Sequence, residues 1–238
     1  MRTEAIKLLD HGYLRLVESW GRGDAGEAEA GIIEAARQST QGSFRGWQED
    51  EKLLRYLFTS KPRHATPFEF CGMTIEVQAP IIVFREWQRH RTQGYNEMSA
   101  RYAPLPNVNY LPDEERLFLT DTANRQSGPA AGATPLDKWA AVGWLADLAD
   151  LYDQCEQVYQ RGLQTGVSKE LARLALTVGR YSRMRATANL RNWLAFHELR
   201  ADSKAQYEIR QYAEAIGVLL AQEFPRTWAL YQQEKNGP

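Results

Sequence analysis

Residues 89–102 read RHRTQGYNEMSARY and hold donors, acceptors and aromatic rings more densely than any other window of the sequence. Three arginines and a histidine supply nitrogen donors, while Asn96, Glu97 and Ser99 add an amide, a carboxylate and a hydroxyl. The planar fork of arginine grips phosphate through two parallel hydrogen bonds and also stacks on rings. Gly94 lets the backbone approach a ligand closely. The stretch therefore indicates a site for an anion carried by a polar heterocycle.

The composition favours one globular domain over a nucleic-acid binder or a membrane protein. The 238 residues are 43% hydrophobic, and a formal net charge of −1 means that the arginines serve anions in a local pocket. Two cysteines, Cys71 and Cys155, without a Cys/His cluster at zinc spacing, exclude a disulfide scaffold and argue against a structural metal. The N-terminus lacks the features of a signal peptide, and no apolar run reaches membrane-spanning length. We expect a soluble, cytoplasmic protein.

The first third of the chain alternates between strand and helix patterns. Residues 5–20 are consistent with a strand-like entry followed by a short helix. Apolar residues at helical spacing predict helices over 27–37 and 49–58, and strict alternation predicts a half-buried strand over 73–78. A helix that begins near Pro80 then delivers the arginine-rich stretch.

The remainder is predicted to be mainly helical. Residues 103–136 form a long functional loop with a mobile tip at 123–128, and a long helix follows over 136–166. The apolar positions of that helix, Cys155 among them, keep helical spacing and are expected in the core. A strand over 180–191 is predicted to run into a helix that ends at Arg200, followed by a last helix with a wide apolar stripe.

The spacing Arg-His-Arg, seven residues, then Ser99 resembles the signature of the flavin-dependent thymidylate synthases. The segments His64-x-Thr66-Pro-Phe-Glu69 and 200–210 are similar to two further motifs of that family, so the matched blocks extend over 64–102 and 170–213. The resemblance implies an α+β fold, with mixed helices around an antiparallel sheet in a single domain over 1–238. It also implies a homotetramer whose active sites are shared between subunits.

The activity implied by the resemblance is C5 methylation of dUMP to dTMP. Methylenetetrahydrofolate would donate the carbon, and NADPH would donate reducing equivalents through bound FAD. Residue by residue, the family's FAD contacts match Thr66, Arg89, His90, Arg91, Glu97, Asn189, Leu190, Arg191 and Ala195. Its nucleotide contacts match Glu86, Gln88, Arg89, Glu97, Met98, Ser99, Ala100, Arg101, Arg173 and Arg200.

Arg200 is the expected catalytic residue. C5 of uracil becomes nucleophilic when electron density enters the ring, and a cation beside the developing anion lowers that barrier. From the local sequence alone, Arg200 is more simply a surface arginine that pairs with Asp202, and the resemblance reverses this preference. Ser99 lacks a convincing base and is assigned to nucleotide binding. The conventional thymidylate synthase needs a nucleophilic cysteine, whereas Cys71 lies in a strand pattern and reads as structural.

Several positions depart from the family pattern. Glu86 stands where Gln is usual, Thr177 where Pro is common, Ala195 where His or Asn often contacts flavin, and Lys204 where His is frequent. These departures leave open a related flavin enzyme that acts on another pyrimidine nucleotide, by methylation of UMP or by C5 hydroxymethylation. An alternative of another class is a non-catalytic module that binds RNA or nucleotides through 85–102. Such a module would be colourless, and its binding would weaken steeply with salt.

Overall fold

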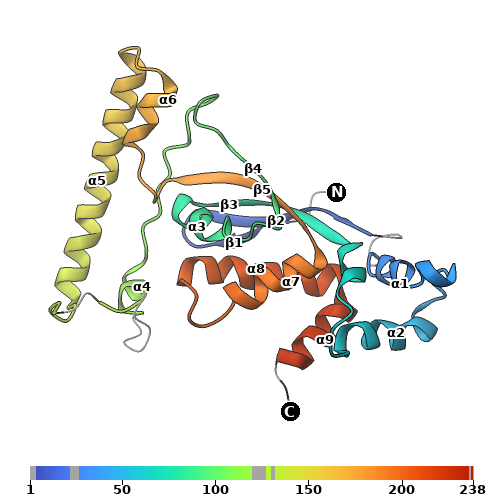
Figure 1. The fold of residues 1–238 in the computed structure, drawn as a ribbon. Helices are drawn as coiled ribbons and strands as arrows, with labels where there is room; N and C mark the ends of the chain where they lie inside the picture. Colours follow the sequence, from blue (N-terminus) through green and yellow to red (C-terminus); the bar gives the residue numbers. More distant parts are fainter. Residues whose placement is uncertain (1–3, 22–26, 120–126, 130–131, 236, 238) are drawn as a thin grey trace.

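The computed structural model describes residues 4–21, 27–119, 127–129, 132–235 and 237. At its centre lies an antiparallel sheet of five strands in the order β1-β2-β3-β5-β4 (Figure 1). The strands are β1 (Ile6–Leu8), β2 (Gly12–Trp20), β3 (Gly72–Pro80), β4 (Gly94–Glu97) and β5 (Tyr181–Asn189). The predicted α+β class is confirmed, and so are the strands expected over 73–78 and 180–191.

Two helices cover one face of the sheet, α7 (Leu190–Arg200) and α8 (Tyr207–Glu223) (Figure 1). Met73, Ile75 and Val77 of the central strand β3 alternate toward this face and are completely buried. Trp193 of α7 packs among them, and its indole N–H donates to the backbone oxygen of Met73 (3.0 Å). Burial of these apolar side chains is the main force that joins helices to sheet.

Three helices gather at one end of the sheet: α1 (Ala30–Ala36), α2 (Trp47–Thr59) and α9 (Pro225–Lys235) (Figure 1). A short 3₁₀ turn, η1 (Gln38–Thr40), lies between α1 and α2, and a second, η2 (Thr66–Glu69), lies between α2 and β3. Glu29 is fully buried here and accepts hydrogen bonds from the backbone N–H groups of Arg226 (3.1 Å) and Thr227 (2.6 Å). Its carboxylate thereby satisfies the free N–H groups at the start of α9.

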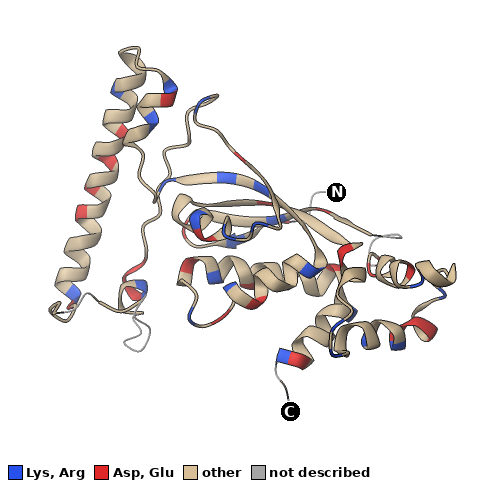
Figure 2. Cartoon of the chain, viewed as in Figure 1, with Lys and Arg blue, Asp and Glu red and all other residues tan. Residues whose placement is uncertain are grey.

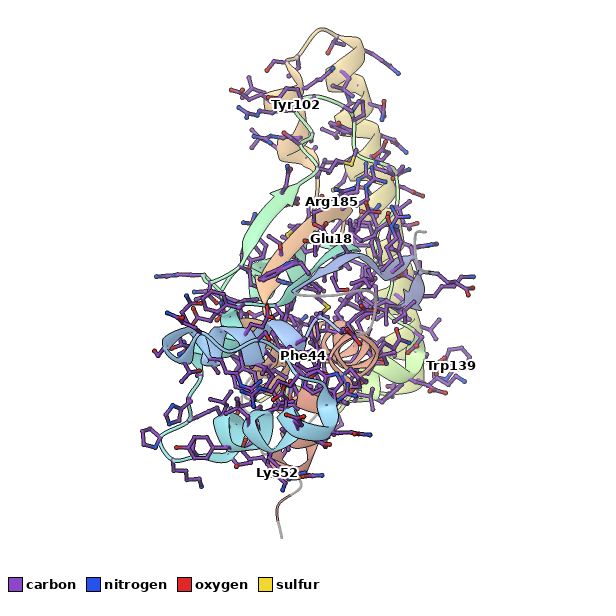
Figure 3. The ribbon with its side chains drawn as sticks, turned by 90° about the vertical axis from the view of Figure 1, so that its right-hand side faces the viewer. Glu18, Phe44, Lys52, Tyr102, Trp139 and Arg185 are labelled. Carbon is purple, nitrogen blue, oxygen red and sulfur yellow. The ribbon has the colours of Figure 1, made fainter. Side chains whose placement is uncertain are left out.

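The long helix α5 (Lys138–Gln164) stands apart from the sheet beside α4 (Glu114–Phe118), α6 (Lys169–Ala172) and η3 (Arg173–Ala175) (Figure 1). Figure 2 shows acidic residues repeating along α5. The expectation that its apolar stripe lies in the core is wrong for the single chain. Only Ala141 and Tyr159 of α5 are buried, Cys155 is half-buried, and Trp139 is 86% exposed. Figure 3 shows Trp139 projecting away from the ribbon.

Other differences from the expected elements follow from long-range pairing. Residues 12–20, expected to include a short helix, form β2 because they pair with both β1 and β3. The strand β4 inside the arginine-rich stretch and the separate helix α9 were not predicted. The segment 103–136 contains α4, and most of its predicted mobile tip, residues 123–126, lies outside the described part of the chain. No helix in the described ranges is long and apolar enough to span a bilayer.

Candidate active site

The short helix α3 (Ile81–Trp87) and the turn after it divide the predicted nucleotide residues between two cavities. At 3.6 residues per turn, Ile82, Glu86 and Arg89 fall on one face, and they line a cavity of about 1050 Å³. Arg85 and Gln88 fall on a neighbouring face and line a second cavity of about 530 Å³. The buried side of α3 faces the core through Val83, Phe84 and Trp87.

The larger cavity, called the Arg200 cavity below, is strongly cationic. Its wall includes Glu86 and five basic side chains, which are Arg89, Arg116, Arg200, Lys204 and Arg210. Glu86 is the one acidic side chain among the described residues of this wall. Arg116 is paired with Glu208 and Arg200 with Glu86, and the positive charge that remains on this concave wall focuses the field on an anionic ligand.

Arg200 is held in this cavity by three hydrogen bonds. Its Nη1 donates to Oε2 of Glu86 (2.6 Å), its Nη2 to the backbone oxygen of Glu86 (2.9 Å), and its Nε to Nε2 of His90 (2.9 Å). The Arg200 side chain is only 12% exposed. The ion pair with Asp202 that the local sequence suggested is replaced by contacts more than a hundred residues away in the chain.

His90 is neutral at physiological pH. Burial, reinforced by the Arg200 guanidinium, lowers the pKa of His90 to about 4. Its Nε2 accepts from Arg200, so the ring proton of the neutral form sits on Nδ1. The ring also packs against Phe196 of α7, with centroids 4.7 Å apart, and Phe196 packs in turn on Trp87. Phe196 and Arg200 are one helical turn apart on α7, so the same face fixes both groups.

The smaller cavity, called the Ser99 cavity below, collects most of the other predicted nucleotide contacts. Its wall includes Gln88, Glu97, Met98, Ser99, Ala100 and Arg173. The Nε2 of Gln88 lies 3.5 Å from Oε2 of Glu97 across it. Arg101 follows directly, and its backbone N–H donates to Oγ of Ser99 (3.3 Å). Arg173 donates through Nε to the backbone oxygen of Glu170 (3.2 Å) and is otherwise exposed.

Two polar residues of the Ser99 cavity were not predicted as site residues. Arg85 is exposed, and its guanidinium has no partner within the described ranges. Thr177 carries a buried Oγ1 that also lacks a hydrogen-bond partner there. A sequence signal for Arg85 existed, since it lies three residues before Gln88 and therefore about one turn away. The burial of the Thr177 hydroxyl depends on packing and had no such signal.

Part of the set predicted to contact the cofactor meets at the N-terminal end of α7, whereas Arg89 lines the Arg200 cavity, His90 contacts Arg200, and Glu97 lines the Ser99 cavity. Glu69 of η2 pairs with Arg191, and Nδ2 of Asn192 donates to the backbone oxygen of Thr92 (3.3 Å). Asn189 caps α7 by accepting a hydrogen bond from the backbone N–H of Asn192 (3.0 Å). Three segments that are distant in sequence, 66–69, 91–92 and 189–192, are thereby brought together.

Individual members of that set differ in what they offer a ligand. Arg89 and Arg91 are exposed, and no described residue pairs with either guanidinium. Ala195 is exposed one turn beyond Arg191 on the same face of α7. Leu190 is completely buried, and its backbone N–H donates to the oxygen of Cys71 (2.7 Å). Its side chain is therefore part of the core and is not available for a cofactor.

A family model and individual relatives of known name place the chain in the same family. A family model described as thymidylate synthase complementing protein matches residues 15–226. Flavin-dependent thymidylate synthases of Rickettsia prowazekii and Gluconobacter oxydans are 34% and 37% identical to the chain. Each alignment covers 98% of this chain, and they cover 80% and 74% of the respective relatives.

Solved structures are also similar to this chain over nearly its whole length. The UMP/dUMP methylase PolB from Streptomyces cacaoi, bound with 5-Br UMP, matches with a TM-score of 0.78 and 31% identity, over 95% of this chain and 96% of that one. The same methylase bound with 5-Br dUMP matches equally well, over 97% of its chain.

Proposed function

The chain belongs to the flavin-dependent thymidylate synthase family, and we propose that it methylates C5 of dUMP at a site built around Arg200. The carbon would come from methylenetetrahydrofolate and the reducing equivalents from NADPH. The observation that carries the proposal is the three-point fixation of Arg200 inside a cationic cavity. A guanidinium held in advance stabilises charge in the transition state without reorganising at the moment of reaction.

Arg200 is the proposed catalytic residue. Three of its five N–H groups are engaged by Glu86 and His90, which leaves one each on Nη1 and Nη2 for a ligand. Directed at a uracil carbonyl or ring nitrogen, these donors favour negative charge on the ring and make C5 more nucleophilic. The reaction joins C5 to the transferred carbon and breaks the bonds from that carbon to the folate nitrogens, so that tetrahydrofolate leaves. It also releases the C5 proton and reduces the transferred carbon to a methyl group at the expense of NADPH.

The Ser99 cavity is the proposed binding site for the nucleotide phosphate. Arg173 supplies a guanidinium group and Ser99 a hydroxyl, and Arg101, which follows this wall in the chain, would add a second guanidinium group. Guanidinium forks match the geometry of phosphate oxygens and bind them through charge-assisted hydrogen bonds. Arg85 adds a further cation to the same wall.

The residues at the N-terminal end of α7 fit a bound FAD. Its pyrophosphate needs cations and backbone N–H donors, and this region offers the exposed guanidinium of Arg91, which pairs with no described residue, beside the first turn of α7. Arg89, on the wall of the Arg200 cavity, would supply a second cation. Thr66, Asn189 and Arg191 would complete the contacts. When bound, FAD supplies the redox chemistry that carries reducing equivalents from NADPH to the transferred carbon.

A second copy of the chain is proposed to complete each site. Arg200 and Ser99 line separate cavities of one chain, so a single nucleotide would reach both groups if the Arg200 cavity of one copy faced the Ser99 cavity of another. The exposed apolar side chains around α5 need a covering surface, and they include Trp139, Val142, Leu151, Val158, Leu171 and Leu174. These exposed groups support the homotetramer with shared sites that the family resemblance implies.

UMP is a second candidate substrate. The solved methylase PolB is described with ligands of both the ribose and the deoxyribose series. The Oε1 atom of Glu86 has no hydrogen-bond partner among the described residues, so it can accept from a ribose hydroxyl in the Arg200 cavity. Competition between UMP and dUMP for the purified protein separates the two substrates.

The test of the proposal combines a visible spectrum with one substitution. Purified protein should bind flavin, and NADPH should reduce it under anaerobic conditions in the presence of nucleotide. Arg200→Ala should lower methyl transfer to dUMP by about a hundredfold or more while flavin stays bound. Arg55→Ala, an exposed arginine on α2, is the matched control and should keep activity. Protein that binds no flavin, or an Arg200→Ala variant with full turnover, would reject the proposal.

A further inference from the structure

Glu86 is an unexpected residue in the wall of an anion-binding cavity. The Arg200 cavity is lined by five basic side chains, and a carboxylate among them weakens the attraction for a phosphate or an ionised uracil. Glu86 is also partly open to the cavity, with 39% of its side chain exposed. Its negative charge therefore opposes the binding of an anionic substrate. A direct contact with the nucleotide does not explain why a carboxylate stands at this position.

The contacts of Glu86 are directed at Arg200. One residue supplies two of the three acceptors of the guanidinium, through Oε2 to Nη1 (2.6 Å) and through its backbone oxygen to Nη2 (2.9 Å). The third acceptor, Nε2 of His90, binds the Nε edge (2.9 Å). Acceptors on all three nitrogens fix both the position and the plane of the guanidinium, which a single contact would leave free to rotate.

Arg200 needs this fixation because of where it sits. It is the last residue of α7, and its long side chain would otherwise sample many rotamers. His90 is itself immobilised against Phe196, and the backbone oxygen of Glu86 belongs to α3. Among the three acceptors of Arg200, the Glu86 carboxylate is therefore the one that can move. The length of the Glu86 side chain decides whether its Oε2 atom holds Nη1 of Arg200 in place.

We propose that Glu86 is a positioning residue, which orients Arg200 for catalysis by accepting a hydrogen bond from Nη1. This role is carried by Oε2 and the backbone oxygen of Glu86, and for dUMP it replaces the direct nucleotide contact that the family resemblance implies for position 86. It rests on the proposed function of Arg200. The geometry requires an acceptor oxygen at hydrogen-bond distance from Nη1 of Arg200. It does not require that this oxygen carry a negative charge.

Two substitutions of Glu86 test separately whether the length of its side chain or its negative charge matters. Glu86→Gln keeps the length of the side chain and an acceptor oxygen but removes the charge. Glu86→Asp keeps the charge but shortens the reach by one methylene group. We expect Glu86→Gln to retain most of the turnover, with nucleotide binding that is equal or tighter. We expect Glu86→Asp to lower kcat by about tenfold or more with little change in KM, because a hydrogen bond to a charged group is lost in the transition state.

The measurements are kcat and KM for dUMP, flavin content, and nucleotide affinity from the flavin absorbance. Glu49→Gln, which removes an exposed carboxylate on α2, is the control for a change of charge alone. An active Glu86→Asp with an impaired Glu86→Gln would overturn the proposal, and so would equal effects of both. Loss of nucleotide affinity with kcat preserved would make Glu86 a nucleotide ligand instead. A wild type that binds flavin but transfers no methyl group would reject the proposed function, and this inference with it.

Discussion

Two histidines, His90 and His197, are kept neutral by the side chains packed around them. Burial lowers the pKa of each to about 4, with Arg200 adding to the effect at His90 and Lys235 at His197. His197 is 5% exposed and packs edge-on against the stacked rings of Trp228 and Tyr231, and its Nδ1 is 2.9 Å from the Tyr231 hydroxyl. Because the folded protein binds these protons less tightly than the unfolded chain, acid must favour unfolding.

The stability of the protein should therefore decrease as pH falls from 6.5 toward about 4. In that interval the unfolded chain takes up a proton at His197 and the folded chain does not, which removes at most about 3 kcal/mol of unfolding free energy. Above pH 6.5 this contribution is fully present. Denaturant unfolding at several pH values measures the slope.

His197→Phe keeps a ring against Trp228 and Tyr231 and should flatten this slope, although it loses the hydrogen bond to Tyr231. His64→Gln is the control, because it removes an exposed histidine without changing the packing around His197. An unchanged slope in His197→Phe would contradict the assignment of acid sensitivity to this position.

At the scale of elements, α5 is tied to the sheet through one buried ion pair. The Arg180 side chain is 2% exposed and pairs with Glu156 of α5, which is 13% exposed. Arg180 also donates to Oδ1 of Asn107 and precedes β5, so it joins the helix, the loop before α4 and the sheet. A charge buried this deeply is destabilising without its partner.

Glu156→Leu should lower the unfolding free energy by about 3–5 kcal/mol, because the Arg180 guanidinium is left buried without its carboxylate. Arg180→Met combined with Glu156→Leu should recover most of that loss, since no unpaired charge remains. Chemical denaturation of the two single variants and the double variant gives the coupling energy. The exposed pair Arg45–Glu49 provides the comparison and should couple by less than about 1 kcal/mol. Additive effects at Arg180 and Glu156 would show that the pair does not anchor α5.

At the scale of the whole molecule, mixed oligomers can test whether Arg200 and Arg173 of one site come from different copies of the chain. Arg200→Ala and Arg173→Ala should each inactivate the protein when every chain carries the change. If one chain supplies Arg200 and another supplies Arg173, random mixing of the two variants restores about a quarter of the sites, because each site draws its two arginines independently. Co-expression of differently tagged chains followed by a methyl-transfer assay measures this recovery. Mixed oligomers without activity would place both arginines in a site formed by a single chain.

The sequence by itself determined the family, the α+β class and the chemical types at the site. The signature over 89–102, the strand around Ile75 and the helix ending at Arg200 depend on local residue type and periodicity, which are fully present in the chain. The same local rules could not assign β2 or β4, whose conformation is set by pairing with distant strands.

Only the tertiary structure decided what the site residues do to one another. Glu86 and His90 lie more than a hundred positions from Arg200 in the chain, and their grip on its guanidinium arises from the packing of α3 against α7 and α8. The separation of Arg200 from Ser99, and the exposure of the apolar stripe of α5, likewise follow from how faces are oriented in space. Periodicity predicts that a face is apolar, but the other elements of the fold decide whether that face becomes core or remains open to a partner.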